Sequence, residues 1–158
     1  MGTLAQRLES ERLRYPGLLP EEILVLRAWL NLHQTEYDRF DYNMRIGQGI
    51  DPGPAYTPEV RKQAILNTQL RIDAVAYKGL QATIIEVKRR ATPSNVGQLL
   101  TYFSVWRIEF PTTPEPLLLL VCNQFSQHIL PRVRESNITL EQVQVDFSGL
   151  KAKTTPAA

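Results

Sequence analysis

The chain has 158 residues, of which 43% are hydrophobic and 22% are charged. These proportions are typical of a folded globular protein and exclude disordered and fibrous classes. Lys and Arg outnumber Asp and Glu by only 18 to 16, so the net charge does not by itself indicate the charge of a partner. One cysteine and two histidines exclude a disulfide scaffold and a cysteine-based zinc site.

The length of the chain suits one domain with a single core. We expect a helical N-terminal extension over residues 1–19, a core over residues 20–147 and a tail over residues 148–158, all within one domain that spans residues 1–158. No stretch has the length and hydrophobicity of a membrane span or of a signal peptide. The sequence therefore predicts a soluble, cytoplasmic protein that has no membrane partner.

The first part of the chain predicts two helices and a strand. Residues 3–14 carry leucines at near-helical spacing among charges, which is typical of a short amphipathic helix. Residues 20–37 predict a longer helix, because a proline and two glutamates open it and apolar residues recur along one stripe. His33 lies on that stripe, so we expect it to be a core histidine. Residues 40–46 alternate apolar and polar side chains, as a half-buried strand does.

The middle of the chain predicts a β-hairpin followed by a helix. After a loop rich in proline and glycine, residues 59–68 are compatible with a short helix or with an irregular approach to the next strand. Residues 70–77 and 81–88 are both strand-like and flank a Lys-Gly turn, which indicates a hairpin. Residues 95–110 then place apolar side chains at helical spacing.

The last part of the chain predicts a buried strand, a helix and a final strand. Residues 117–123 form a continuous apolar run, typical of a strand that is buried on both faces. Residues 132–136 predict a short helix, and residues 137–147 predict the last strand. The complete order indicates an α/β fold with a mixed central sheet, in which an antiparallel meander leads through a helical crossover into the buried strand, flanked by helices.

Two carboxylates and a lysine stand on the predicted hairpin. Asp73 and Glu86 lie at similar distances from the turn, so the two strands can bring them together. They would repel each other unless a divalent cation lay between them, and Mg²⁺ or Mn²⁺ prefers such oxygen ligands. Lys88 shares a face with Glu86 and could stabilise charge on a phosphate there. Gln98 and Tyr102 share one face of the following helix and could hydrogen-bond the same phosphate.

These residues also have structural interpretations. Glu86 and Lys88 could be an ion pair on an exposed edge strand, which protects a sheet against aggregation. Gln98 could be an ordinary surface residue, and Tyr102 could be a core residue with its hydroxyl at the rim. Four bases with no acid between them suit either a phosphate backbone or a solvated surface. These bases are Lys88, Arg89, Arg90 and Arg107.

The order of Asp73, the tripeptide Glu86-Val87-Lys88 and a Gln-x-x-x-Tyr element resembles the PD-(D/E)XK nuclease superfamily, which has the restriction-endonuclease-like fold. The Gln-x-x-x-Tyr element is similar to that of its RecB-type exonuclease branch. The resemblance spans residues 21–145 and implies a metal-dependent nuclease that hydrolyses phosphodiester bonds in DNA.

The resemblance also implies roles for single residues. Asp73, Glu86 and the Val87 carbonyl would bind Mg²⁺ or Mn²⁺, and Lys88 would be the catalytic lysine. Gln98 and Tyr102 would be supporting residues of the catalytic site. In such proteins an acid from the preceding helix often completes the metal site. Glu36 is the best match, and Asp38 and Asp41 are the alternatives.

A second function stays open at this point. Small proteins of this fold class occur in bacteriophage genomes, and a fold alone does not fix a function. The chain could be a structural component of a phage particle, such as a head-tail connector or neck-type protein, that retains the nuclease-like fold without turnover. Its partners would then be phage structural proteins or further copies of the chain, and it would lie in the virion or the host cytoplasm.

Overall fold

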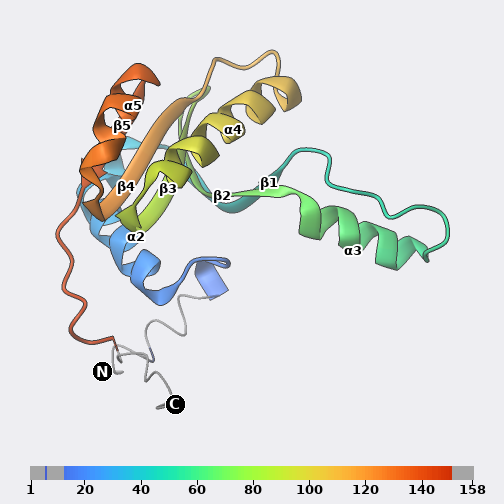
Figure 1. Ribbon diagram of the computed structural model, residues 1–158, viewed down its shortest axis with the longest axis horizontal. Helices are drawn as coiled ribbons and strands as arrows, with labels where there is room; N and C mark the ends of the chain where they lie inside the picture. The colour runs from blue at the N-terminus through green and yellow to red at the C-terminus, as the bar shows by residue number, and fades with distance from the viewer. Residues whose placement is uncertain (1–5, 7–12, 151–158) are drawn as a thin grey trace.

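The computed structural model describes residue 6 and residues 13–150, and its helices and strands follow the predicted α/β order (Figure 1). The helix predicted over residues 3–14 and the tail predicted over residues 148–158 lie largely outside the described residues. The elements are α2 (Pro20–His33), the 3₁₀ helix η1 (Gln34–Glu36), β1 (Arg39–Ile46), α3 (Pro58–Thr68), β2 (Leu70–Lys78), β3 (Gln81–Ala91), α4 (Pro93–Glu109), β4 (Leu117–Phe125), the 3₁₀ helix η2 (Gln127–Ile129), α5 (Leu130–Glu135) and β5 (Ile138–Gln142). Among these helices, none combines the length and the hydrophobicity that crossing a bilayer requires.

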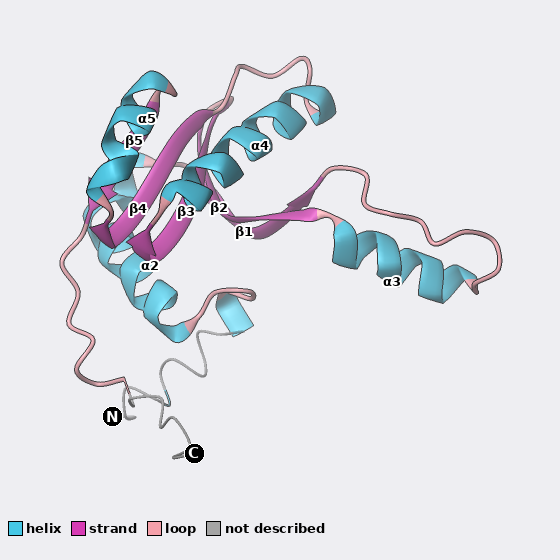
Figure 2. Ribbon diagram, in the orientation of Figure 1, coloured by secondary structure: helices cyan, strands magenta, loops and turns pink. Residues whose placement is uncertain are grey.

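The five strands form one mixed sheet in the order β1-β2-β3-β4-β5 (Figure 2). The first three strands are an antiparallel meander, and β4 and β5 run parallel to β3. α4 connects β3 to β4 and packs on one face of the sheet, while α2 packs on the other face. The predicted fold class, with its meander and its helical crossover into a buried strand, is therefore confirmed.

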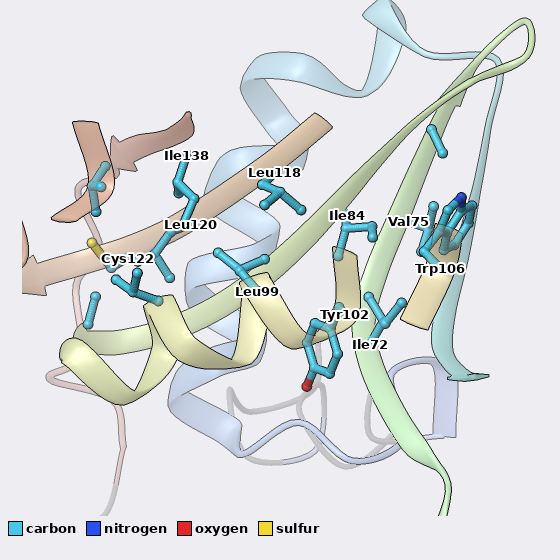
Figure 3. Packing of buried hydrophobic residues seen from close by; sticks show 14 of the residues in the cluster. Ile72, Val75, Ile84, Leu99, Tyr102, Trp106, Leu118, Leu120, Cys122 and Ile138 are labelled. Atoms are coloured by element: carbon cyan, nitrogen blue, oxygen red, sulfur yellow. The ribbon is translucent and has the colours of Figure 1, made fainter. Parts of the chain in front are cut away.

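Local sequence explains why α4 forms where it does. The Asn95 side chain accepts a hydrogen bond from the Thr92 backbone N–H at 2.9 Å, and Pro93 occupies the first turn, so the orphan groups of the helix start are satisfied. Leu99, Tyr102 and Trp106 recur at helical spacing and are buried against the sheet (Figure 3). The helix thus presents one apolar face and carries Tyr102 to the sheet.

The structure resolves one open alternative and differs from the sequence-based expectations in two details. The ambiguous segment over residues 59–68 is a helix, whose first turn is capped by the Thr57 hydroxyl. The last strand ends at Gln142 instead of continuing to residue 147, because the chain leaves the sheet after Val143 donates to the Cys122 carbonyl. The prediction of a core histidine at His33 is wrong, since this side chain is partly exposed and bonds to two carboxylates.

The β2–β3 hairpin opens into a fork at one end. The two strands pair from the turn as far as Ala74 and Ile85, and beyond this point β2 continues beside β1 while β3 continues beside β4. Opposite Asp73 on β1, Asn43 is unpaired and has a φ of 52°, a left-handed conformation that asparagine tolerates. The regular alternation of side chains is interrupted at this point. We call the group of Asp73, Glu86, Val87 and Lys88 the fork.

Candidate active site at the fork

Asp73 closes the fork from the β2 side. Its Oδ2 atom accepts a hydrogen bond of 2.8 Å from the backbone N–H of Val87 on β3. The carboxylate therefore takes the place of a backbone partner where the two strands diverge. Asp73 and Glu86 follow directly after the last paired residues, so the structure brings these two carboxylates together, as the hairpin pattern predicts.

Glu86 is the most deeply buried charged residue at the fork. Only 2% of its surface is exposed, and its Oε2 atom has no hydrogen-bond partner among the described residues. A buried carboxylate oxygen without a partner costs free energy. Burial raises the pKa of both Asp73 and Glu86, and the negative charge of Asp73 raises that of Glu86 further. The metal-free fork thus favours protonation of these carboxyl groups.

Lys88 supplies the positive charge of the fork. Its Nζ atom lies 3.0 Å from Glu22 Oε1 and 3.8 Å from Glu86 Oε1. Burial opposes the charged form, but the hydrogen bond and the charge of Glu22 raise the pKa of Lys88 above its usual value. Lys88 is therefore an ammonium ion beside two buried carboxylates, and the exposed-edge interpretation of Glu86 and Lys88 does not hold because β3 lies inside the sheet.

Glu22 is the acid that the preceding helix contributes. It lies in the first turn of α2 and is 5% exposed. One carboxylate oxygen holds Lys88, and the other accepts a 3.0 Å hydrogen bond from the Leu19 backbone N–H at the helix start. The sequence assigned this glutamate only to the helix N-terminus. Its spacing of three residues from Leu19 is that of the glutamate in a capping box, without the Ser or Thr of that motif. Nothing in the sequence indicates that the same side chain also reaches β3.

The prediction that Glu36 completes the site is wrong in the structure. Glu36 Oε2 lies 2.6 Å from His33 Nδ1, and His33 is eleven residues, or about 16 Å of helix, beyond Glu22. The alternatives are also placed elsewhere. Asp38 accepts a hydrogen bond of 2.6 Å from the Gly79 backbone at the hairpin turn, and Asp41 pairs with its neighbour Arg39.

The structure separates the two residues predicted on α4. Tyr102 is 6% exposed, and its hydroxyl donates a 2.8 Å hydrogen bond to the Arg71 carbonyl on β2. Burial raises the pKa of Tyr102, and the nearby charges of Glu86 and Asp73 raise it further, so the phenol is close to the fork. Gln98 is exposed, and its Oε1 atom accepts from Asn95 at 2.9 Å. No described contact joins Gln98 to the fork.

The structure also places the four basic residues of the predicted cluster in different surroundings. Arg89 lies 3.4 Å from Glu21 and packs over the ring of Phe147. Arg107 lies 3.3 Å from Glu115 near the C-terminal end of α4. Arg90 is exposed and forms no ion pair with any described residue. Only Lys88 of the four therefore contacts the carboxylates of the fork.

The donor set of the fork fits a hard divalent cation. In the part of the chain that the structure describes, no group of three or more His, Cys, Asp or Glu side chains is arranged to hold a metal. Mg²⁺, however, commonly uses one or two carboxylates and completes its shell with water and substrate phosphate. Asp73 and Glu86 offer these carboxylates, and the unpartnered oxygen of Glu86 is a free ligand atom.

Comparison with known proteins supports the architecture. No protein-family model matches the sequence, and no curated protein sequence is similar to it. A crystal structure of a repair endonuclease from Pyrococcus abyssi has a TM-score of 0.51 at 12% identity, over 79% of this chain and 47% of that one. A structure of an EndoMS–dsDNA2 complex has a TM-score of 0.48 at 12% identity, over 82% and 47% of the two chains. The chain thus spans about half the length of these structures. It has the restriction-endonuclease-like fold.

Proposed function

We propose that the protein is a divalent-metal-dependent nuclease that hydrolyses phosphodiester bonds in DNA. The observation that carries this proposal is the fork itself, where the half-buried Asp73 and the buried Glu86, which has an unpartnered oxygen, lie beside a lysine ammonium ion. A purely structural sheet gains nothing from such a group, because each buried charge costs free energy that an apolar side chain would not. Perturbed carboxylates that surround one cation are typical of catalytic sites.

The side chains of the fork have separate tasks in this proposal. Asp73, Glu86 and the Val87 carbonyl would hold Mg²⁺ or Mn²⁺. When bound, the ion would supply positive charge against the charge that develops on the phosphate in the transition state. Lys88 adds a second positive charge, and the short contact to Glu22 fixes its position. Tyr102 binds the β2 backbone at Arg71 and so fixes the strand that carries Asp73.

DNA is the proposed substrate class. The solved structure with a TM-score of 0.51 is a repair endonuclease by its name, which supports a nucleic-acid phosphodiester as the reacting group. The RecB-type branch and the phage particle stay hypotheses, and no contact in the described part of the chain favours a structural component over an enzyme. Circular and linear DNA distinguish internal cleavage from cleavage that starts at an end, because only an enzyme that acts internally cleaves a closed circle.

The test is cleavage of linear and circular duplex DNA with Mg²⁺, with Mn²⁺ and with EDTA. We expect metal-dependent loss of DNA by the wild type and none by Lys88→Ala, because the substitution removes the positive charge beside the carboxylates. Lys78→Ala is the matched control, since Lys78 is exposed at the turn end of the same hairpin. Equal cleavage by wild type and Lys88→Ala contradicts the proposal. A folded wild type that cleaves nothing but assembles into rings supports the structural component instead.

A further inference from the structure

The connection between β1 and β2 forms an arm that projects from the body of the molecule. This arm, residues 47–69, comprises an extended loop and α3, and Figure 1 shows it reaching away from the sheet and from the other helices. Its base is the pair Ile46–Leu70, the last partners of the β1–β2 ladder. β2 reaches Asp73 three residues after Leu70. The arm therefore starts about 10 Å along β2 from Asp73.

The arm is held together by its own contacts. Arg61 forms a two-pronged ion pair with Asp51, with N···O distances of 2.9 and 2.6 Å. The Gln69 amide donates to the Gly47 carbonyl at 2.7 Å. Gly49 has a φ of 65° and lies so close to α3 that an added Cβ would be 2.3 Å from the Ile65 carbonyl oxygen. The loop thus packs directly on the helix, and the arm is ordered in advance of any partner.

α3 lacks the buried face that normally stabilises a short helix. It has 11 residues and none of them is buried. Helices of this length are marginal in water by themselves, and packing of an apolar face usually supplies their stability. The outward surface of α3 is polar, with Glu59, Lys62, Gln63 and Asn67 all exposed. The exposed side chains of α3 therefore suit a polar partner.

Charge indicates the chemistry of that partner. Three cations on or beside the arm form no ion pair with any described residue, namely Arg45, Lys62 and Arg71. Arg45 and Arg71 are direct partners across β1 and β2, and Arg71 is exposed and lies two residues before Asp73. Glu59 is the one acid of the arm that is not bound to an arginine. Unpaired cations that lead from a catalytic site onto a projecting element suit a phosphate backbone.

A second copy of the chain is a less favoured partner for the arm than a DNA duplex. The arm exposes Ile50, Tyr56 and Val60, but α3 also exposes charged and amide side chains, namely Glu59, Lys62, Gln63 and Asn67. A stable protein interface buries about 800 Å² on each partner and has few charges at its centre. The length of α3, about 16 Å, instead corresponds to about five base pairs of duplex, and a helix fits into a major groove about 12 Å wide.

From these observations we infer that the arm binds the DNA duplex next to the scissile bond, with Arg45, Lys62 and Arg71 contacting phosphates. This inference rests on the proposed function, because it takes the fork as the site of cleavage. The arm would hold the duplex by its backbone and thus without strong sequence preference. Binding would depend on salt, because each phosphate contact releases counterions.

The test is the affinity for a fluorescent duplex, measured by anisotropy in EDTA at several KCl concentrations. We expect Lys62→Ala with Arg71→Ala to weaken binding about tenfold and to lower the slope of log affinity against log salt by about 1.8. The matched control is Lys78→Ala with Arg134→Ala, which removes two exposed cations outside the arm. In a further variant, Asn-Gly replaces residues 47–69 between the partners Ile46 and Leu70. Binding should weaken and the salt slope should fall by about 0.9, because Lys62 is lost while Arg45 and Arg71 remain.

The outcomes separate this inference from the proposed function. If the wild type cleaves DNA and the arm variants bind duplex as tightly as the control does, the inference about the arm is wrong and the nuclease stands. If removal of the arm converts a dimer into a monomer with unchanged DNA affinity, the arm is a dimer contact and the inference is also wrong. If the wild type neither binds nor cleaves DNA, the proposed function fails and the arm proposal fails with it.

Discussion

Two polar clusters lie at opposite ends of α2, and they use the same kinds of groups in different ways. At the start of the helix, Glu22 meets Lys88 at the fork. At the end of the helix, both nitrogens of His33 bond to carboxylates, Nδ1 to Glu36 and Nε2 to Glu141. Each cluster joins one cation to several acids. The first holds an unsatisfied buried oxygen, and the second does not.

The cluster around His33 has a structural role. Glu141 on β5 bonds to His33 and also accepts a 3.0 Å hydrogen bond from the Trp29 ring N–H, so it fastens the last strand to α2. Its carboxylates are partly solvated, with Glu36 57% exposed. At the fork, burial and like charges raise the pKa of two carboxyl groups instead. A group of charged side chains therefore does not by itself indicate a functional site, whereas a buried charged group without a partner does.

Removal of one carboxylate from each cluster should give the largest difference between them, and this difference is in the rate of cleavage. Glu86→Gln keeps the size of the side chain but removes a proposed metal ligand, so cleavage should fall by a factor on the order of 10²–10³. Glu141→Gln, the matched change at the other end of α2, should leave the cleavage rate within about twofold. Initial rates on linear duplex with Mg²⁺ measure both, and a similar loss in the two variants would remove the distinction between the clusters.

The same two substitutions should change the free energy of unfolding in opposite directions. In EDTA at neutral pH, Glu86→Gln should raise the free energy of unfolding by about 1–2 kcal/mol, because the fold keeps Glu86 protonated at a pH at which the unfolded chain ionises it, and glutamine does not carry this cost. Glu141→Gln should lower it by about 1 kcal/mol, because it weakens the bond to His33. Urea unfolding checks the signs. A destabilised Glu86→Gln would mean that the fork carboxylate supports the fold.

The pH dependence of the metal-free wild type should show the strain of the fork. Folding raises the pKa of Asp73 and Glu86 above their unfolded values of 3.8 and 4.5. Stability from these groups is therefore greatest below pH 3.8 and falls as pH rises towards the folded values. Added Mg²⁺ should raise the thermal midpoint at pH 8 in the wild type and not in Glu86→Gln. Equal stabilisation of both proteins would place the ion outside the fork.

The smallest expected effect is the contribution of His33 to the pH dependence of stability. Burial lowers its pKa, but the hydrogen bonds to Glu36 and Glu141 outweigh this and raise the pKa above 6.5. Its stabilising contribution is thus complete below pH 6.5 and is lost as pH rises through the raised value. Because the groups are partly exposed, the change should be under about 1 kcal/mol. Unfolding of wild type and His33→Gln at pH 6 and pH 9 measures it, and a difference that grows with pH would contradict the assignment.

Much of the fold follows from local patterns in the sequence. The hairpin, the helix after it and the apolar strand over residues 117–123 each have a clear periodicity, and their order defines the crossover. Asp73, Glu86 and Lys88 follow from this hairpin, because side-chain alternation and the position of the turn fix which residues meet. α3 stayed ambiguous because it has no buried face, and its sequence therefore lacks the apolar stripe on which helix prediction depends.

The residues that sequence reasoning missed depend on the packing of distant segments. Glu22 and Lys88 are 66 positions apart, and no periodicity reports that the first turn of α2 lies over β3. Glu36 is the best match to an acid from the helix predicted over residues 20–37, but η1 turns it towards His33. Gln98 and Tyr102 share a helix face in the pattern, yet only the phenol is long enough and deep enough to reach β2. Contacts of this kind are decided by tertiary structure.

We propose the fork as a metal-dependent site for the cleavage of DNA. The most direct test is the rate at which wild type and Glu86→Gln cleave linear duplex with Mg²⁺, after addition of EDTA, and after excess Mg²⁺ is restored. We expect that the wild type cleaves, stops in EDTA and resumes, while folded Glu86→Gln stays inactive throughout. Cleavage that persists in EDTA, or equal rates for the two proteins, would contradict it.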